Sequence, residues 1–167
     1  MSQNLELSGV SEIQPWKEGA PESKTKRTAA IVLSPDGTQV MLLKNLDPEL
    51  DMVNVPNWNL RGKENSAQTV TQQLYDRTGY DDIESIQVLP GTIEWKFRKT
   101  KTDAKNESAI YDNSVYLVKL ASMNADKIED VSHSVLWKNL DEMNKFFATD
   151  GSNGSGYLLW ELYKNTQ

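Results

Sequence analysis

The residues most able to do chemistry in this chain lie close together at positions 72–77, in the segment QQLYDR. If this segment is helical, Gln73, Asp76 and Arg77 share one face, because residues three and four positions apart are neighbours on a helix. Several carboxylates in this arrangement could hold a magnesium ion, which prefers oxygen ligands. The segment offers instead a neutral amide, one carboxylate and a permanent cation that repels metal ions. A conventional magnesium site is therefore not expected here.

Arg77 has two alternative interpretations. A guanidinium binds phosphate oxygens in pairs and needs no metal ion as a bridge, so Arg77 could bind a phosphorylated ligand together with Arg61 and Lys63. A cation near the end of a helix is also favoured by the helix dipole when no ligand is present. Ordinary polar helix surface is the corresponding simple explanation for Gln72 and Gln73.

The acidic candidates are Glu64 and Asp76, which we consider both as catalytic groups and as ligands for Mg or Mn. A glutamate just before a helix also suits the positive end of the helix dipole, so Glu64 has a structural explanation as well. Glu94 and Asp112 fall on segments with strand-like patterns. They could line a ligand pocket, or they could be outward-facing polar residues.

Three further side chains have both a functional and a structural interpretation. Trp58 could stack on a nucleotide base, and so could Trp95, but a tryptophan in a strand more often packs in the core. His133, the only histidine, could act as a base near a pocket or pack at a strand edge. The sequence alone leaves these alternatives open.

The helix that would carry residues 72–77 is expected at 66–78. Asn65 or Ser66 can cap its start, and Gly79 stands where a left-handed residue would end it. Four residues at spacings of three and four form the stripe that should pack this helix on a sheet: Ala67, Val70, Leu74 and Thr78.

The remaining pattern alternates between strands and loops. Pro35-Asp36-Gly37 lies between two apolar-rich runs, at 27–34 and 39–44, which is typical of a β-hairpin. Further strands are expected at 58–60, 85–89, 92–98, 111–122 and 132–137; loops at 47–56 and 99–108; and helices at 141–147, capped by Asp141, and 157–164, with Leu158, Leu159 and Leu162 facing inward. This order predicts an α+β fold, an α/β/α sandwich with a mixed sheet in a single domain.

Residues 1–26 mix Gly, Pro, Ser and charge with little periodicity, so they are predicted to be a mostly irregular N-terminal leader, from which Trp16 could dock on the body. The domain is then expected to span residues 27–167. A net charge of −6 argues against general binding to nucleic acid. No apolar run reaches the roughly 20 residues that a membrane span needs, and no secretory signal or cysteine is present. We expect a cytoplasmic protein without a membrane partner.

Around the predicted helix the chain resembles the Nudix family, whose sequence box is written GX5EX7REUXEEXGU. Aligning Leu74, Thr78-Gly79 and Tyr80 with the end of the box places QQ at 72–73 on its RE pair, DR at 76–77 on its EE pair and Glu64 on the acid before the helix. The segments WNLRGK at 58–63 and SVLWKNLDE at 134–142 resemble the family segments W-x-L-P-G-G and W-x-x-L-D-E. The resemblance spans residues 27–165.

The resemblance implies a Nudix-type sandwich. In active members it implies cleavage of a nucleoside diphosphate derivative by a water that is activated at a divalent metal ion held by helix glutamates. Because the box is degraded here, we expect a pseudoenzyme that binds a nucleotide-like or phosphorylated ligand, or a protein partner, without efficient hydrolysis. The residues expected to bind this ligand are Trp58, Arg61, Lys63, Gln73, Arg77 and Glu94.

Two alternatives remain open. The chain could be an atypical hydrolase of nucleoside diphosphate derivatives that holds Mg or Mn through Glu64, Asp76 and acidic residues from elsewhere in the chain. It could also be a scaffold for protein interactions whose pocket is empty. A homodimer is expected from the resemblance alone.

Overall fold

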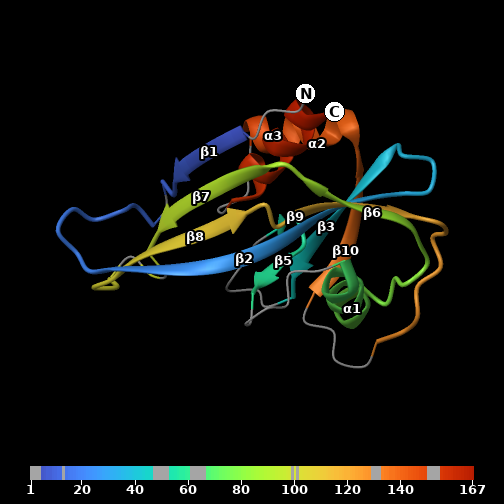
Figure 1. The fold of residues 1–167 in the computed structure, drawn as a ribbon, viewed down its shortest axis with the longest axis horizontal. Helices are drawn as coiled ribbons and strands as arrows, with labels where there is room; N and C mark the ends of the chain where they lie inside the picture. Colours follow the sequence, from blue (N-terminus) through green and yellow to red (C-terminus); the bar gives the residue numbers. More distant parts are fainter. Residues whose placement is uncertain are drawn as a thin grey trace.

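The computed structural model describes residues 5–12, 14–46, 53–60, 67–98, 100, 102–128, 133–149 and 155–167 (Figure 1). The elements in chain order are β1 (Leu5–Val10), β2 (Glu22–Leu33), β3 (Gln39–Asn45), β4 (Val53–Asn54), β5 (Asn57–Asn59), α1 (Ala67–Thr78), β6 (Ile83–Leu89), β7 (Gly91–Phe97), β8 (Asn106–Asp112), β9 (Val115–Leu120), β10 (His133–Asn139), α2 (Leu140–Thr149) and α3 (Gly156–Thr166).

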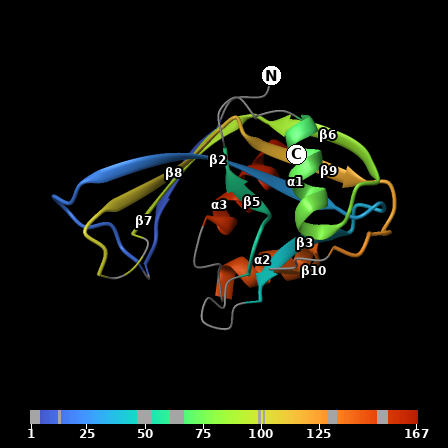
Figure 2. The same cartoon turned by 90° about the horizontal axis from the view of Figure 1, so that it is seen from below.

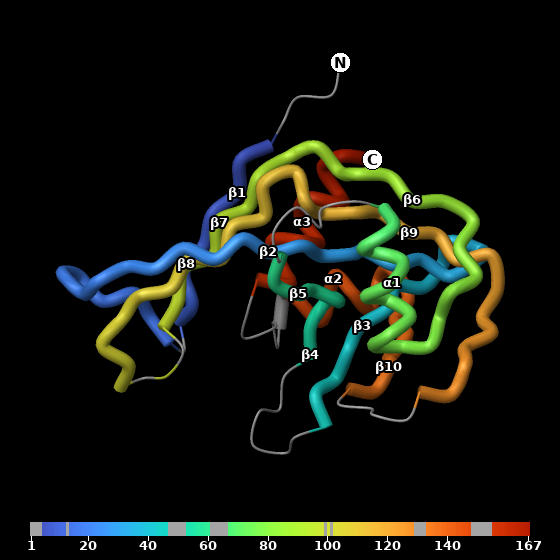
Figure 3. The backbone as a smooth tube through the Cα atoms, turned by 60° about the horizontal axis from the view of Figure 1, so that its bottom comes forward, coloured from blue at the N-terminus to red at the C-terminus, as the bar shows by residue number. Residues whose placement is uncertain are grey.

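The long strand β2 belongs to two sheets and joins them (Figure 3). Its first half lies parallel to β8, beyond which β7 and β1 follow; this first sheet extends to one side of the molecule, away from α1 (Figure 2). Its second half pairs in parallel with β9 and antiparallel with β5 and the start of β3. β6 pairs with β9, and β10 pairs with β3.

Helices lie on both sides of the second sheet, α1 on one side and α2 with α3 on the other (Figure 1). Alternate residues of β2 pack with them: Ala30 and Val32 belong to the buried cluster of α1, whereas Ala29 and Ile31 belong to that of α2 and α3. A strand that is buried on both faces needs an apolar side chain at every position, which explains the run AAIVL. The predicted α+β architecture, a mixed sheet between helices, is confirmed.

The N-terminal segment contains more strand than the sequence indicated. Residues 5–10 form β1, which pairs in parallel with β7, and β2 already begins at Glu22. Both stretches are polar, and their strand structure depends on partners that are distant in the chain, so periodicity alone does not identify them. Trp16 docks on the first sheet, where the Lys96 Nζ atom lies 5.1 Å from the centre of its ring.

The strand predicted over residues 111–122 is in fact two strands, β8 and β9. Asn113 between them has a φ of 51°, in the left-handed region that asparagine tolerates better than most residues. This break lets β8 pair with β7 in the first sheet while β9 pairs with β6 in the second. β8 also begins at Asn106, inside the predicted loop.

The helix α1 ends as predicted. Gly79 has a φ of 79°, and its N–H donates to the carbonyl oxygen of Tyr75 at 2.8 Å. Val70, Leu74 and Thr78 are buried. Ala67 is exposed, because the buried stripe begins one turn after the first helical residue. The predicted caps, Asn65 and Ser66, lie outside the described residues.

The second helix begins one residue earlier than expected, and its cap is Asn139 rather than Asp141. The N–H of Glu142 donates to Asn139 Oδ1 at 2.8 Å, and the N–H of Asn139 donates to Glu142 Oε1 at 3.1 Å. This reciprocal pair is a capping box. In α3, Leu158, Leu159 and Leu162 are buried as predicted. None of the described helices is long and apolar enough to cross a membrane.

The predicted hairpin between β2 and β3 is confirmed. Gly37 has a φ of 74°, and Asp36 Oδ1 accepts hydrogen bonds from the Ser34 hydroxyl at 2.7 Å and the Thr38 hydroxyl at 2.8 Å. These bonds, that from Ser34 first, lower the pKa of Asp36 to about 2.

Candidate functional site

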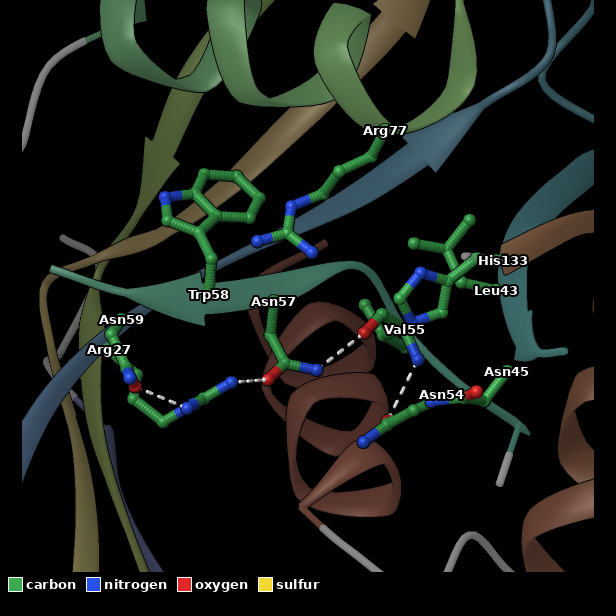
Figure 4. A pocket seen from close by; sticks show the side chains of 10 residues that line it. All are labelled: Arg27, Leu43, Asn45, Asn54, Val55, Asn57, Trp58, Asn59, Arg77 and His133. Atoms are coloured by element: carbon green, nitrogen blue, oxygen red, sulfur yellow. Dashed lines mark hydrogen bonds between the residues drawn. The ribbon is translucent and has the colours of Figure 1, made fainter. Parts of the chain in front are cut away.

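A pocket of about 310 Å³ lies where β5, the end of α1 and the paired strands β3 and β10 meet (Figure 4). Its volume is at the lower end of the range of roughly 300–1,000 Å³ typical of small-molecule sites. The lining combines two arginines, one histidine, four asparagines and three apolar residues: Arg27, Arg77, His133, Asn45, Asn54, Asn57, Asn59, Leu43, Val55 and Trp58.

The short strand β5 places functional groups on two sides of the pocket. Successive side chains of a strand point to opposite faces, so Trp58 lies on the side of α1 whereas Asn57 lies on the opposite side (Figure 4). Trp58 is only 4% exposed and packs in the same cluster as Leu74 of α1. Its ring forms a wall of the pocket and is part of the core at the same time.

Arg77 reaches the pocket from the last turn of α1, and its guanidinium lies beside Trp58 (Figure 4). Within the described part of the chain its guanidinium donates one long hydrogen bond, from Nε to Gln73 Oε1 at 3.4 Å. Burial lowers the pKa of Arg77, and the nearby positive charge of Arg27 lowers it further, although Asp76 acts in the opposite direction. The guanidinium remains charged because its ordinary pKa is far above neutrality.

Arg27 approaches from β2 on the other side of β5 (Figure 4). Its Nη1 and Nη2 atoms donate to the side-chain oxygens of Asn59 and Asn57, and its Nε donates to the Tyr111 hydroxyl at 3.3 Å. All three acceptors are neutral. In the described part of the chain, no ion pair joins Arg27 or Arg77 to a carboxylate.

The hydrogen bonds inside the pocket use up acceptors and leave donors. The Oδ1 atoms of Asn57 and Asn59 accept from Arg27, and Oδ1 of Asn54 accepts from the N–H of Val55 at 2.8 Å. A guanidinium has five N–H groups and no acceptor, so both arginines keep N–H groups beyond the bonds described. The pocket therefore suits a ligand that is rich in acceptor oxygens.

His133 is half-buried at the start of β10, where it pairs in register with Asn45 of β3. Burial lowers its pKa below the ordinary value of 6.5, and the positive charge of Arg77 lowers it further. Both effects favour the neutral imidazole, which has one nitrogen as donor and the other as acceptor.

The structure brings together some of the residues singled out from the sequence and separates others. Arg77, Trp58 and His133 line the pocket; Gln73 does not line it but accepts the hydrogen bond from Arg77. Asp76 is exposed and accepts a hydrogen bond from Gln72 at 2.8 Å.

Glu94 and Asp112 lie on the first sheet, away from the pocket. Glu94 accepts from the Ser108 hydroxyl at 3.4 Å and pairs with Lys96 at 3.7 Å, and Asp112 accepts from Thr92. Arg61, Lys63 and Glu64 lie outside the described residues.

The described lining of the pocket does not fit a magnesium or manganese ion. These ions require mainly carboxylate and water oxygens, and none of the ten lining residues is an aspartate or a glutamate. Nor do the described residues contain a group of three His, Asp or Glu side chains that could hold a metal ion.

Sequence reasoning did not identify Arg27 and the asparagines as pocket residues. Arg27 stands at the start of an apolar run, and that pattern predicts only a strand. The available signal was the segment NVPNWN, in which three polar amides, Asn54, Asn57 and Asn59, surround Trp58 within six positions. A strand with amides on one face and a tryptophan on the other separates a polar pocket from a core.

Several solved structures share this fold. A NUDIX hydrolase from Nitrosomonas europaea is 16% identical, with a TM-score of 0.59, and the match covers 86% of this chain and 88% of that one. The NUDIX domain of Shewanella oneidensis NrtR, complexed with ADP ribose, is 17% identical with a TM-score of 0.56, and the match covers 89% of this chain and 92% of that one. A C. elegans Ap4A hydrolase in a binary complex is 13% identical with a TM-score of 0.55, and the match covers 84% of this chain and 95% of that one.

No protein-family model and no curated protein sequence matches this chain. At identities of 13–17% the structural likeness speaks for the fold and not for the chemistry. On that likeness, the chain is a single-domain α+β sandwich with the Nudix fold.

Proposed function

We propose that the pocket binds a small phosphorylated or nucleotide-like ligand without hydrolysing it efficiently. The observation that carries this proposal is the pair of guanidinium groups of Arg27 and Arg77, which line one pocket from opposite sides of β5. None of the described residues that line this pocket is a carboxylate. The positive charges of Arg27 and Arg77 repel each other, so an anion that binds in the pocket they both line is attracted by both.

The chemistry of the lining favours phosphate over other anions. Phosphate offers several acceptor oxygens to the forked donors of arginine, and the side-chain oxygens of Asn54, Asn57 and Asn59, which would repel it, already accept bonds from the protein. Because the whole chain carries a net charge of −6, anion binding depends on this local arrangement and not on the average charge of the surface.

The comparisons support a ligand with a nucleoside part. The NUDIX domain of NrtR was solved with ADP ribose, and its fold covers 89% of this chain. ADP ribose combines a diphosphate with two polar sugars and a base. The apolar lining residues Leu43, Val55 and Trp58 could contact the less polar part of such a ligand.

Thermal unfolding in the presence of EDTA tests the proposal. We expect ADP-ribose to raise the melting temperature, with ADP and inorganic phosphate acting more weakly and uncharged adenosine having no effect. Binding at 100 times Kd stabilises the folded state by about 2.7 kcal/mol, which for a protein of this size corresponds to roughly 5–10 °C. If adenosine stabilises the protein as well as ADP-ribose does, the arginine pair does not carry the binding.

The alternative function is hydrolysis of a nucleoside diphosphate derivative with Mg or Mn. The observation in its favour is that the similar structures include proteins described as a NUDIX hydrolase and an Ap4A hydrolase. Incubation of the same compounds with each metal ion, followed by chromatography of the products, decides between the two. Turnover that is lost in Glu64→Gln would establish a hydrolase, and the absence of both turnover and thermal shift would favour a protein-interaction scaffold.

A further inference from the structure

Arg27 is anchored in the structure but not neutralised. Its three hydrogen-bond acceptors, on Asn57, Asn59 and Tyr111, fix the direction of the guanidinium without supplying a negative charge. A half-buried cation with neutral partners keeps its full attraction for an anion. Because its side chain is already ordered, it loses little conformational freedom when that anion binds.

The Tyr111 hydroxyl lies at the centre of this arrangement. Tyr111 is 1% exposed, and its hydroxyl accepts from Arg27 Nε at 3.3 Å. The same oxygen lies 3.0 Å from Ser155 Oγ and 3.5 Å from Asn57 Oδ1. A phenol has one proton to donate and two lone pairs, so it can bond to Arg27 and Ser155 at the same time.

Ser155 connects this network to α3. Its side chain is buried, and its carbonyl oxygen accepts from the N–H groups of Leu158 and Leu159 at 3.0 and 3.1 Å in the first turn of the helix. A chain of contacts thus runs from the pocket through Arg27 and Tyr111 to the start of α3. The helix in turn packs its leucines against β2 and the first sheet.

We infer that Tyr111, held by Ser155 at the start of α3, is a positioning residue that fixes the Arg27 guanidinium at the pocket and thereby sets the affinity for an anionic ligand. The inference rests on the proposed function as far as the ligand is concerned. A tyrosine at this core position is otherwise unnecessary, because a phenylalanine would fill the same space among Ile93, Trp95 and Ala109. The hydroxyl is needed only for its bonds.

A double-mutant cycle tests the effect on the ligand. ADP-ribose affinity is measured by calorimetry in EDTA for the wild type, Tyr111→Phe, Arg27→Ala and the double variant. We expect Tyr111→Phe to weaken binding about three- to tenfold when Arg27 is present, as for the loss of one ordinary intramolecular hydrogen bond, and to have no further effect in Arg27→Ala. Equal losses in both backgrounds would overturn the inference.

Hydrogen exchange at the Arg27 side chain tests the positioning itself without any ligand. The Nε–H of Arg27, observed by NMR, should exchange with water at least several times faster in Tyr111→Phe than in the wild type. Tyr163→Phe is the matched control. Tyr163 packs against the same buried cluster as Tyr111, but its ring lies against Trp160 and it makes no hydrogen bond to Arg27 among the described residues.

Unchanged exchange in Tyr111→Phe would show that Tyr111 does not position Arg27, whatever the ligand. If no phosphorylated compound binds the wild type, the proposed function fails, and the exchange experiment still decides whether Tyr111 anchors Arg27. The two failures are therefore distinguishable.

Discussion

Asp76 and Arg77 are neighbours in the chain and have opposite charges, but they face different surroundings. Arg77 is half-buried in the pocket beside Trp58, whereas Asp76 lies on the exposed surface of α1 and accepts a hydrogen bond from Gln72. Adjacent residues of a helix point about 100° apart. The helix therefore presents a cation to the pocket and its only carboxylate to the solvent.

This difference teaches that the function of a polar helix residue depends on the face it occupies. α1 has three such faces: an apolar face with Val70 and Leu74 on the sheet, a pocket end with Arg77, and an outer face with Gln72 and Asp76. Substitutions on the apolar face should affect folding, those at the pocket end should affect binding, and those on the outer face should affect neither.

The largest effect is expected on the apolar face. Leu74 is fully buried in the cluster with Ala30, Val32 and Trp58, so Leu74→Ala should leave a cavity and reduce the free energy of unfolding by roughly 2–5 kcal/mol. Urea unfolding followed by tryptophan fluorescence measures this change. Gln72→Ala in the same helix is the control and should change stability by less than about 0.5 kcal/mol.

The next largest effect is expected at the pocket end. Arg77→Ala removes a charged donor and should weaken ADP-ribose binding about ten- to hundredfold, since a hydrogen bond to a charged group contributes about 1.5–3 kcal/mol. Lys24→Ala makes the same change in net charge at an exposed position of β2 and should leave affinity unchanged. An equal loss in both variants would mean that only the overall charge matters, and the distinction between faces would fail.

The pH dependence of stability tests the charge of the pocket through His133. Its pKa is lowered in the folded protein by burial and by Arg77, so the unfolded chain takes up a proton more readily. The free energy of unfolding should therefore decrease as the pH falls through 6.5, the ordinary histidine value. His133→Asn lacks this group. Between pH 7.5 and 5.5 the free energy of unfolding should therefore decrease more in the wild type than in the variant.

Unfolding curves at four pH values in this range give the slope of the free energy of unfolding against pH for each protein. The contributions of other titrating groups cancel in the difference between wild type and variant. A slope of the opposite sign would mean that a carboxylate stabilises the imidazolium. The pocket would then contain an acid, and its contrast with the outer face of α1 would disappear.

The local elements could be predicted from the sequence, but their pairing could not. The turn at Asp36, the helix end at Gly79 and the inward leucines of α3 are determined by neighbouring residues, so their signals are present in short segments. β1 and the polar start of β2 become strands only because β7 and β8 lie beside them. Long-range pairing of polar strands leaves little trace in periodicity.

The pocket residues could be predicted only in part, because some of them reach the pocket through long-range strand pairing. Arg77 could be singled out because a cation in place of an acid is visible in a helical segment. Arg27 could not, since its role comes from the register that sets it opposite Asn59 of β5 and from the Tyr111 hydroxyl, which belongs to a distant strand. Arg61, Lys63 and Glu64 lie outside the described residues, and their roles stay predictions.

The smallest effect is expected on the outer face. Asp76→Asn removes a carboxylate that makes one exposed i,i+4 hydrogen bond with Gln72, and such pairs stabilise a helix by about 0.2–0.5 kcal/mol. Neither the free energy of unfolding nor the affinity for ADP-ribose in EDTA should change beyond that amount, because the carboxylate is exposed and does not line the pocket. The informative comparison is the same assay with manganese. A manganese-dependent gain in binding or turnover that the wild type has and Asp76→Asn lacks would place Asp76 at a metal site and remove the distinction between the two sides of the last turn of α1.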